Sequence, residues 1–332
     1  MDSGRRLEVE QKVCVGERLT REDGMTLLDS DDLSWLGRLA DRVRRGRHGD
    51  QVSFVVNRRI DASADPARQV ANLATEHVTE LHLAADPALP WPRYPDLLRS
   101  LKRAAPGVRL IAFTSADLDR FAVASGASLE AVLDELMAAG LDALAAGNPA
   151  AWAAPDDGWE RWAAVHRLAH AKGMTTGATL HFATPDEPSQ RIDRLLRLRD
   201  LQDDTGGFTT VTPLLTSGEA PASPIDGLRM VAVSRVVLDN LPHVAANWPT
   251  LGLSVALLSL QFGVDDLDVA GIAGGAPATP TPDPLTRDEL VELIHDAGFR
   301  PVERDGRHAV VREYPAPPSL AERRSIPQQV WS

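Results

Sequence analysis

The chain is poor in cysteine: Cys14 is the single cysteine among its 332 residues. One thiol cannot form an intramolecular disulfide, and it cannot supply the clustered thiolates that hold an iron–sulfur cluster. Residues 1–10 are polar and contain no apolar signal core. We therefore expect a cytoplasmic protein in which Cys14 is a small packing residue.

Long apolar runs and positive net charge are also missing. No apolar stretch approaches the ~18 residues that a membrane span needs. The formal net charge is −12, which disfavours nucleic acids and anionic membranes as partners. The arginine-rich run 42–47 is a local exception, and we interpret it as a solvated helix end. Hydrophobic residues make up 43% of the chain, which is ordinary for a globular protein without a structural metal.

Helix and strand patterns alternate along most of the chain. Apolar residues at helical spacing, with capping residues and glycine stops, predict helices at 29–47, 65–75, 95–104, 129–138, 159–171, 188–203, 228–241 and 286–298. Short runs rich in branched residues predict strands at 52–56, 80–84, 108–113, 141–145, 175–180, 208–211, 243–246, 301–303 and 308–312. Strands separated by helix-length segments favour parallel β-α units, and their number favours a closed barrel.

Five regions follow from this pattern. We expect an N-terminal helical lead-in at 1–50, a barrel at 51–270, a Gly/Pro-rich linker at 271–284, a helix-hairpin extension at 285–314 and a poorly ordered tail at 315–332. Thr286 and Glu289 form a capping box at the start of the extension. Asp305-Gly306 is a hairpin turn signal within it.

Several segments together resemble aminofutalosine synthase and its relative dehypoxanthine futalosine cyclase, the radical S-adenosylmethionine (SAM) enzymes of futalosine-dependent menaquinone biosynthesis. The matching segments are LGRLADRVRRGRHGD (36–50), VNRRI (56–60), TELHL (79–83), IAFT (111–114), GASLEAVLDELMAAGLDAL (126–144), WAAVHRLAHAKG (162–173), RIDRLLRLRDLQDDTGGF (191–208), AVSRVVLDNLPH (232–243), FGVDDLD (262–268) and 285–314. Their order and spacing cover nearly the whole chain. The resemblance implies a radical-SAM-like (β/α) TIM barrel.

The chain departs from that family where the family does its chemistry. The family has a CxxxCxxC loop after the strand that resembles 52–58, and its thiolates hold the cluster. Here NRRI (57–60) leads into DASADP (61–66) and then into a helix, so the cysteine loop is absent. The glycine pair that contacts SAM in the family is replaced by AADP (84–87). An iron–sulfur cluster is therefore not expected, and SAM binding is in doubt.

Other residues could suggest a metal site. His166 and His170 have a helical metal-ligand spacing, but no HExxH signature supports zinc. The acids Asp265, Asp266 and Asp268 lack the spaced loop of a calcium site. We interpret the histidines as structural residues and the acids as solvated turns or caps, and we expect no metal.

Three hypotheses of function remain. The first is a cluster-less homologue that acts as a non-catalytic partner or regulator, a pseudoenzyme that forms a hetero- or homo-dimer with a radical SAM paralogue. The second is a barrel mouth that binds a small molecule, or transforms a futalosine-like nucleoside without radicals. Its candidate pocket residues are Asn57, His82, Thr114, Thr179 and His181, which lie on or just after predicted strands. The third, an active family enzyme, is disfavoured by the cysteine count.

Overall fold

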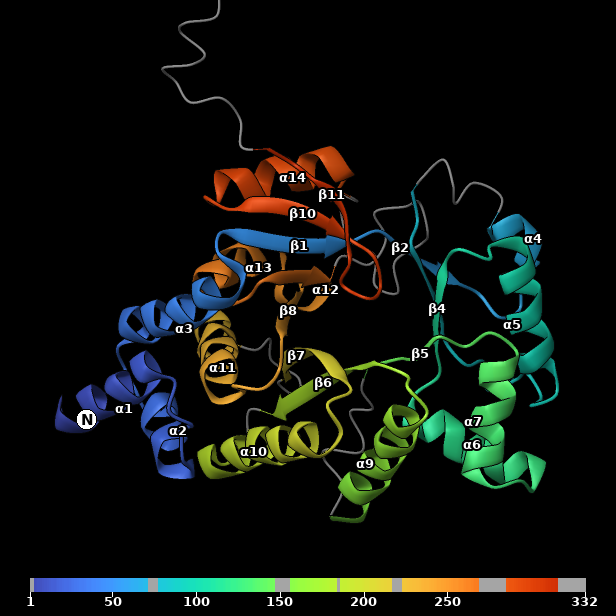
Figure 1. The fold of residues 1–332 in the computed structure, drawn as a ribbon, viewed down its shortest axis with the longest axis horizontal. Helices are drawn as coiled ribbons and strands as arrows, with labels where there is room; N and C mark the ends of the chain where they lie inside the picture. The colour runs from blue at the N-terminus through green and yellow to red at the C-terminus, as the bar shows by residue number, and fades with distance from the viewer. Residues whose placement is uncertain are drawn as a thin grey trace, which may run out of the picture.

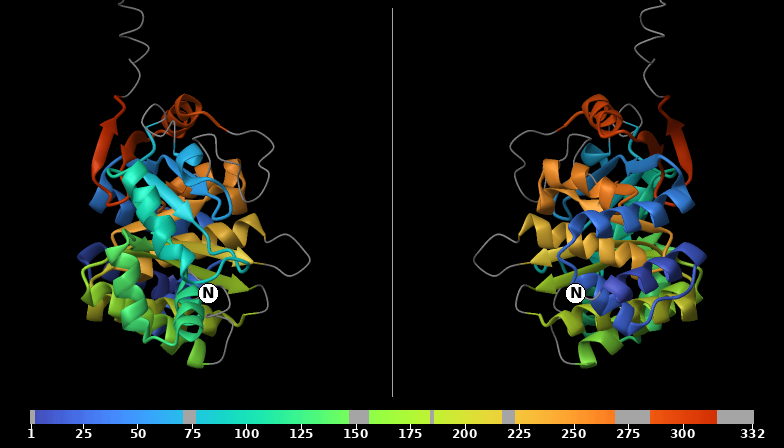
Figure 2. Two further views of the ribbon diagram at one scale, coloured as in Figure 1. Left: turned by 90° about the vertical axis from the view of Figure 1, so that its right-hand side faces the viewer. Right: turned by 90° about the vertical axis from the view of Figure 1, so that its left-hand side faces the viewer.

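Parallel strands form the interior of the molecule, and helices lie on their outer faces (Figure 1, Figure 2). The computed structural model describes residues 3–70, 77–146, 156–183, 186–216, 223–268 and 285–315. The linker predicted at 271–284, the tail beyond 315 and the end of the helix predicted at 65–75 lie outside these residues. The α/β barrel architecture with a helical lead-in is confirmed.

The described elements follow the predicted alternation. The helices are α1 (Ser3–Val15), α2 (Arg21–Leu28), α3 (Leu33–His48), α4 (Pro66–Gln69), α5 (Arg93–Ala104), α6 (Ser115–Ser125), α7 (Leu129–Ala138), α9 (Asp156–Ala171), α10 (Pro188–Thr205), α11 (Pro224–Val237), α12 (Trp248–Leu251), α13 (Leu253–Ser259) and α14 (Arg287–Asp296). The strands are β1 (Gln51–Val55), β2 (Asn57–Ile60), β3 (Glu80–Leu83), β4 (Arg109–Ala112), β5 (Ala143–Leu144), β6 (Thr176–Ala183), β7 (Phe208–Thr216), β8 (His243–Asn247), β9 (Asp266–Asp268), β10 (Arg300–Arg304) and β11 (Val310–Glu313). None of these helices is long and apolar enough to cross a membrane.

Two sheets build the barrel wall. One has the order β2-β3-β4-β5 and the other the order β11-β10-β1-β9-β8-β7-β6. The strand predicted at 52–56 is present as β1, whereas β2 was not predicted. Strand β1 pairs with β9 and β10, and β2 pairs with β3. Among the described residues no strand pairing joins β5 to β6. The Thr179 hydroxyl instead donates to the Ala146 carbonyl at 3.3 Å across that seam, so a side chain bridges it.

The C-terminal extension continues the barrel sheet. Strand β10 runs parallel to β1, with Gln51 opposite Arg300, and β11 returns antiparallel to β10. The predicted helix-hairpin is therefore confirmed, and its helix α14 begins with the Thr286–Glu289 capping box. Because β10 lies directly against the first strand of the barrel, the turn after it reaches the barrel interior.

Within the predicted barrel region, helices α6, α12 and α13 were missed from the sequence. Helix α6 begins at a capping box in which Thr114 accepts a hydrogen bond from the Asp117 amide, and it ends at Gly126 with φ +68°. Its buried apolar side chains, Leu118 and Phe121, are too few to produce a helical pattern.

Two packing expectations were wrong. Cys14 is exposed on α1 rather than packed in the core. The arginine run 42–47 is not wholly solvated, because Arg44 is 0% exposed. Its guanidinium donates to the Gly49 carbonyl at 3.0 Å and lies 4.6 Å from the Phe299 ring centroid. The end of α3 is thus buried against the segment between α14 and β10.

Candidate functional site

A cavity of about 430 Å³ lies inside the barrel. Both sheets and the turn after β10 contribute to its wall. Its polar lining residues are Arg59, Glu80, His82, Arg109, Thr175, Thr176, Thr179, His181, Thr209, Thr210, Thr212, Asn247, Asp266, Arg304 and His308. Cavities of this size are typical of small-molecule sites, and a wall of hydroxyls, imidazoles and guanidinium groups suits a polar ligand.

Three of the five candidate pocket residues line this cavity: His82 on β3, and Thr179 and His181 on β6. The lining residues do not include Asn57 and Thr114. Asn57 is 3% exposed at the start of β2, and the Thr114 hydroxyl is used to cap α6. A position at a predicted strand end therefore did not by itself place a side chain in the cavity.

An ion-paired network stands in the cavity wall. The Arg304 guanidinium donates to both carboxylate oxygens of Asp266, at 2.7 and 2.6 Å, and the Ser53 hydroxyl donates to the same carboxylate at 2.6 Å. Burial raises the pKa of Asp266, but Arg304 outweighs it and holds that pKa well below its usual range. The acid is 0% exposed, so the expectation of solvated turns is wrong for Asp266. A buried carboxylate needs such a partner.

His82 is held by a second buried acid. Its Nε2 lies 2.9 Å from Glu80 Oε2, and Arg304 Nη1 lies 3.7 Å from the other oxygen of Glu80. Burial raises the pKa of Glu80, yet the hydrogen bond from His82 and the charge of Arg304 lower it overall. Because the carboxylate orients the imidazole, His82 is the group in this wall best arranged for proton transfer.

The base of the cavity is closed by the turn that joins β10 to β11. A side-chain carbon at Gly306 would lie 2.4 Å from Glu80 Oε1 and 2.6 Å from Arg109 Cδ, so a larger residue there would displace these two side chains. His308 Nε2 lies 2.7 Å from the Thr210 hydroxyl. These contacts are at the N-terminal ends of β3, β4 and β7. The sequence indicated only a hairpin turn here, and no pattern in it marked the turn as part of the cavity.

The strand end that holds the cluster in the resembling family carries no thiol here. After β2, the Asp61 carboxylate accepts from the Ser63 amide at 2.8 Å and from the Ser63 hydroxyl at 2.7 Å, and Gln69 Oε1 accepts from the Asp61 amide at 2.8 Å. Cys14 lies on α1, on the opposite side of the molecule from β2 (Figure 1). Because iron–sulfur clusters need several thiolates, the residues present do not fit one.

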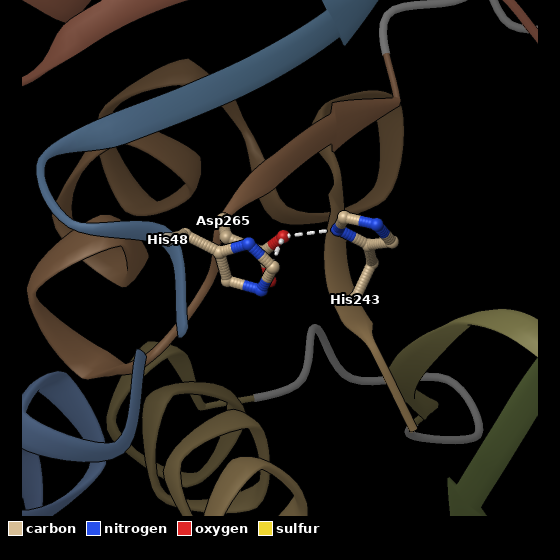
Figure 3. A group of neighbouring side chains, drawn as sticks. All are labelled: His48, His243 and Asp265. Carbon is tan, nitrogen blue, oxygen red and sulfur yellow. Dashed lines mark hydrogen bonds and ion pairs between the residues drawn. The ribbon is translucent and has the colours of Figure 1, made fainter. Parts of the chain in front are cut away.

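His48, His243 and Asp265 form a compact group whose potential ligand atoms lie within 4.8 Å of one another (Figure 3). A shared metal ion would have to lie close to the plane of both imidazoles, about 2.1 Å from each nitrogen. The two rings instead stack, with 4.9 Å between centroids and 26° between planes, so their nitrogens lie side by side. Arg235 pairs with Asp265 and adds a positive charge. We interpret the group as a hydrogen-bonded core cluster.

His166 and His170 share one hydroxyl. His166 Nδ1 and His170 Nε2 lie 2.9 and 2.8 Å from Thr176 Oγ1, and His170 Nδ1 lies 2.8 Å from Thr205 Oγ1. The Thr205 hydroxyl donates to the Leu201 carbonyl, so it accepts from His170 Nδ1–H. His170 Nε2 then accepts from Thr176, which accepts from His166. This chain of bonds gives both histidines a structural role, as expected.

Comparisons with known proteins bear on this geometry. Residues 210–317 match the family model described as the CofH/MqnC C-terminal region. The chain is 40% identical to an aminodeoxyfutalosine synthase of Streptomyces coelicolor over 99% of each chain. It is 33% identical to one of Thermus thermophilus, over 93% of this chain and 96% of that one. The Streptomyces alignment runs over 385 residues, so the relative has segments without a counterpart among the 332 residues here.

Two solved structures share the fold. HydG, a maturase of the FeFe hydrogenase, has a TM-score of 0.67 at 14% identity and covers 91% of this chain and 77% of its own. Methylornithine synthase (PylB) has a TM-score of 0.67 at 15% identity and covers 88% of this chain and 97% of its own. The predicted radical-SAM-like barrel is confirmed by these two likenesses.

Proposed function

The chain belongs to the aminodeoxyfutalosine synthase family, and we propose that it is a member without radical chemistry, serving futalosine-dependent menaquinone biosynthesis as a partner of an active enzyme. The observation that carries this proposal is the connection from β2 to α4, where Asp61, Ser63 and Gln69 hydrogen-bond to one another. Carboxylate, hydroxyl and amide groups do not replace thiolates at an iron–sulfur cluster.

The retained fold supports a role for the outer surface. The alignment with the Streptomyces relative covers 99% of this chain, although the clustered cysteines of the resembling family are absent from it. Most residues of the outer helix α11 are buried, and Trp162 on α9 is 1% exposed. A barrel packed this well offers a rigid surface on which an active paralogue can dock. We therefore favour a non-catalytic partner or regulator over an idle remnant.

Co-expression tests this function directly. We expect the chain, produced anaerobically with an active aminodeoxyfutalosine synthase, to co-purify with it in fixed stoichiometry, and native mass spectrometry should place the only cluster on the partner enzyme. Treated alone with iron and sulfide, this chain should form no cluster chromophore and no 5′-deoxyadenosine from SAM. The Streptomyces coelicolor relative, treated identically, is the positive control.

The two parts of the proposal fail separately. A cluster chromophore on this chain alone, together with 5′-deoxyadenosine, would contradict the loss of radical chemistry. Absence of a complex with the active enzyme would contradict the partner role only. The barrel cavity would then be the functional surface.

The second candidate function is binding of a futalosine-like nucleoside in the barrel cavity, with or without a radical-free reaction. The favouring observation is the row of threonines on β6 and β7, because hydroxyls can bind the hydroxyls of a ribose. His82 and His181 supply imidazoles beside that row. Burial lowers the pKa of His181, so this ring stays neutral near pH 7 and can both donate and accept a hydrogen bond.

Binding of aminodeoxyfutalosine, measured by isothermal titration calorimetry, tests this candidate. We expect saturable binding that weakens about tenfold in His181→Asn, which corresponds to the loss of a hydrogen bond worth about 1.4 kcal/mol. His77→Asn is the matched control, because His77 is exposed and outside the lining residues. No saturable binding by the unmodified protein, or equal weakening in both variants, would exclude this use of the cavity.

A further inference from the structure

The turn that closes the base of the barrel belongs to the C-terminal extension rather than to a barrel strand. It follows β10, and its Gly306 is packed so closely against Glu80 and Arg109 that a larger residue would displace them. His308 at its far end has φ +59°, a left-handed backbone conformation that residues other than glycine rarely adopt. Packing inside the barrel therefore holds this turn in a strained form.

Three stacked imidazoles connect the turn to the rest of the molecule. His308 stacks on His243 with 3.9 Å between centroids and 4° between planes. His243, at the start of β8, stacks in turn on His48 at the end of α3, at 4.9 Å (Figure 3). The column thus joins three segments that are far apart in the sequence.

Hydrogen bonds fix the orientation of these rings. His243 Nδ1 donates to Asp265 Oδ2 at 2.6 Å, and His48 Nε2 donates to the Pro242 carbonyl at 2.9 Å. His308 Nε2 bonds the Thr210 hydroxyl, whereas its Nδ1 is buried and has no hydrogen-bond partner among the described residues. A second proton on His308 would therefore have no acceptor.

The charges around the column oppose protonation. The positive charges of Arg304 and Arg109 face His308. The negative charges of Asp266 and Glu80 offset them in part, but Asp266 is paired with Arg304 and Glu80 is hydrogen-bonded to His82. Arg235, Arg47 and Arg44 face His48, and Asp265 is paired with Arg235. Burial is the main cause that lowers the pKa of His243 to about 3 and of His308 to about 4, and burial also lowers the pKa of His48.

We propose that the column His48–His243–His308 is an acid-sensitive latch that keeps the C-terminal turn in the base of the barrel, and that protonation releases the turn and opens the floor of the cavity. Released, His308 regains water around both nitrogens and the backbone strain at its φ is removed. The remainder of the barrel does not depend on the turn for its own strand pairing, since β1 also pairs with β9.

Hydrogen exchange measured by mass spectrometry tests the latch. With intrinsic rates corrected, amides of the segment 300–314 should exchange about tenfold more readily at pH 5.5 than at pH 7.5, because the released His308 takes up a proton with a pKa near ~6.5. Amides of α11, which are buried and exchange only on global unfolding, serve as the internal reference and should stay far better protected than the segment at both pH values. Protection of the segment equal to that of α11 at pH 5.5 would indicate global unfolding and would overturn the proposal.

Two variants separate the latch from general acid sensitivity. His308→Asn tolerates the left-handed backbone but cannot be protonated, so most of the tenfold difference should disappear. Gly306→Ala should force the turn out at pH 7.5, with little further change at pH 5.5. His295→Asn, on α14 and away from the column, should keep the full pH effect. An unchanged pH effect in His308→Asn would overturn the latch.

Discussion

Replacing Asp265 with alanine is expected to lower the free energy of unfolding by about 3–5 kcal/mol. Asp265 is 2% exposed and Arg235 is 0% exposed, and the two form an ion pair in the interior. Without the carboxylate, the guanidinium stays buried with only the Gly263 and Pro242 carbonyls, at 2.7 and 3.1 Å, as acceptors. Urea denaturation followed by circular dichroism at pH 7.5 measures the loss.

The size of this loss comes from the uncompensated charge of the Arg235 guanidinium. Variants that leave no such charge should therefore lose less free energy of unfolding. Arg235→Met combined with Asp265→Leu removes both charges and should be less destabilised than Asp265→Ala. Asp96→Ala breaks the Arg99 pair, whose side chains are 47% and 74% exposed, and should cost under about 1 kcal/mol. A loss below about 1 kcal/mol in Asp265→Ala would mean that Arg235 finds other partners.

This pair also shows why part of the structure could not be predicted from the sequence. Asp265, Asp266 and Asp268 were interpreted as solvated turns or caps, because a local pattern does not reveal burial. The partners of the first two, Arg235 and Arg304, are remote in the sequence and meet them only when β9 is placed between β8 and β1. Ion pairs of that kind depend on the order of the strands in the sheet, which cannot be predicted from local sequence periodicity.

The helices and strands themselves were easier to predict from the sequence than these pairings. The stop at Gly206 and the capping box at Thr286 were predicted because each depends on residues within a single turn of the backbone. Strand β2 was not predicted, because its residues 57–60 are mostly polar and its pairing partner β3 is remote in the sequence. The cavity residues also divide into local and remote cases. His82 and His181 were predicted because they lie on or just after predicted strands, whereas His308 was missed because it lies in a turn outside the predicted barrel.

Acidification is expected to destabilise the protein steeply, and His166 to be a main cause. His166 is 1% exposed, and burial, with a smaller effect from His170, lowers its pKa to about 3. The unfolded chain takes up this proton near pH ~6.5, whereas the folded protein does not. The stability that His166 contributes is therefore complete above pH ~6.5 and is lost as the pH falls toward 3, by about 1.4 kcal/mol per pH unit.

From pH 7.5 to pH 5, His166 alone should thus remove about 2 kcal/mol from the free energy of unfolding. Urea denaturation at pH 7.5, 6.5, 5.5 and 5 gives the slope. His166→Phe keeps a ring against Trp162 and Phe208, whose ring centroids lie 4.1 and 5.1 Å from that of His166. That variant should be less stable at pH 7.5, because the Thr176 hydroxyl loses a donor, yet its slope should be shallower by about 1.4 kcal/mol per pH unit. The control variant His295→Gln should have the same slope as the unmodified protein. If His166→Phe also has that slope, His166 is protonated in the folded state and the acid sensitivity arises elsewhere.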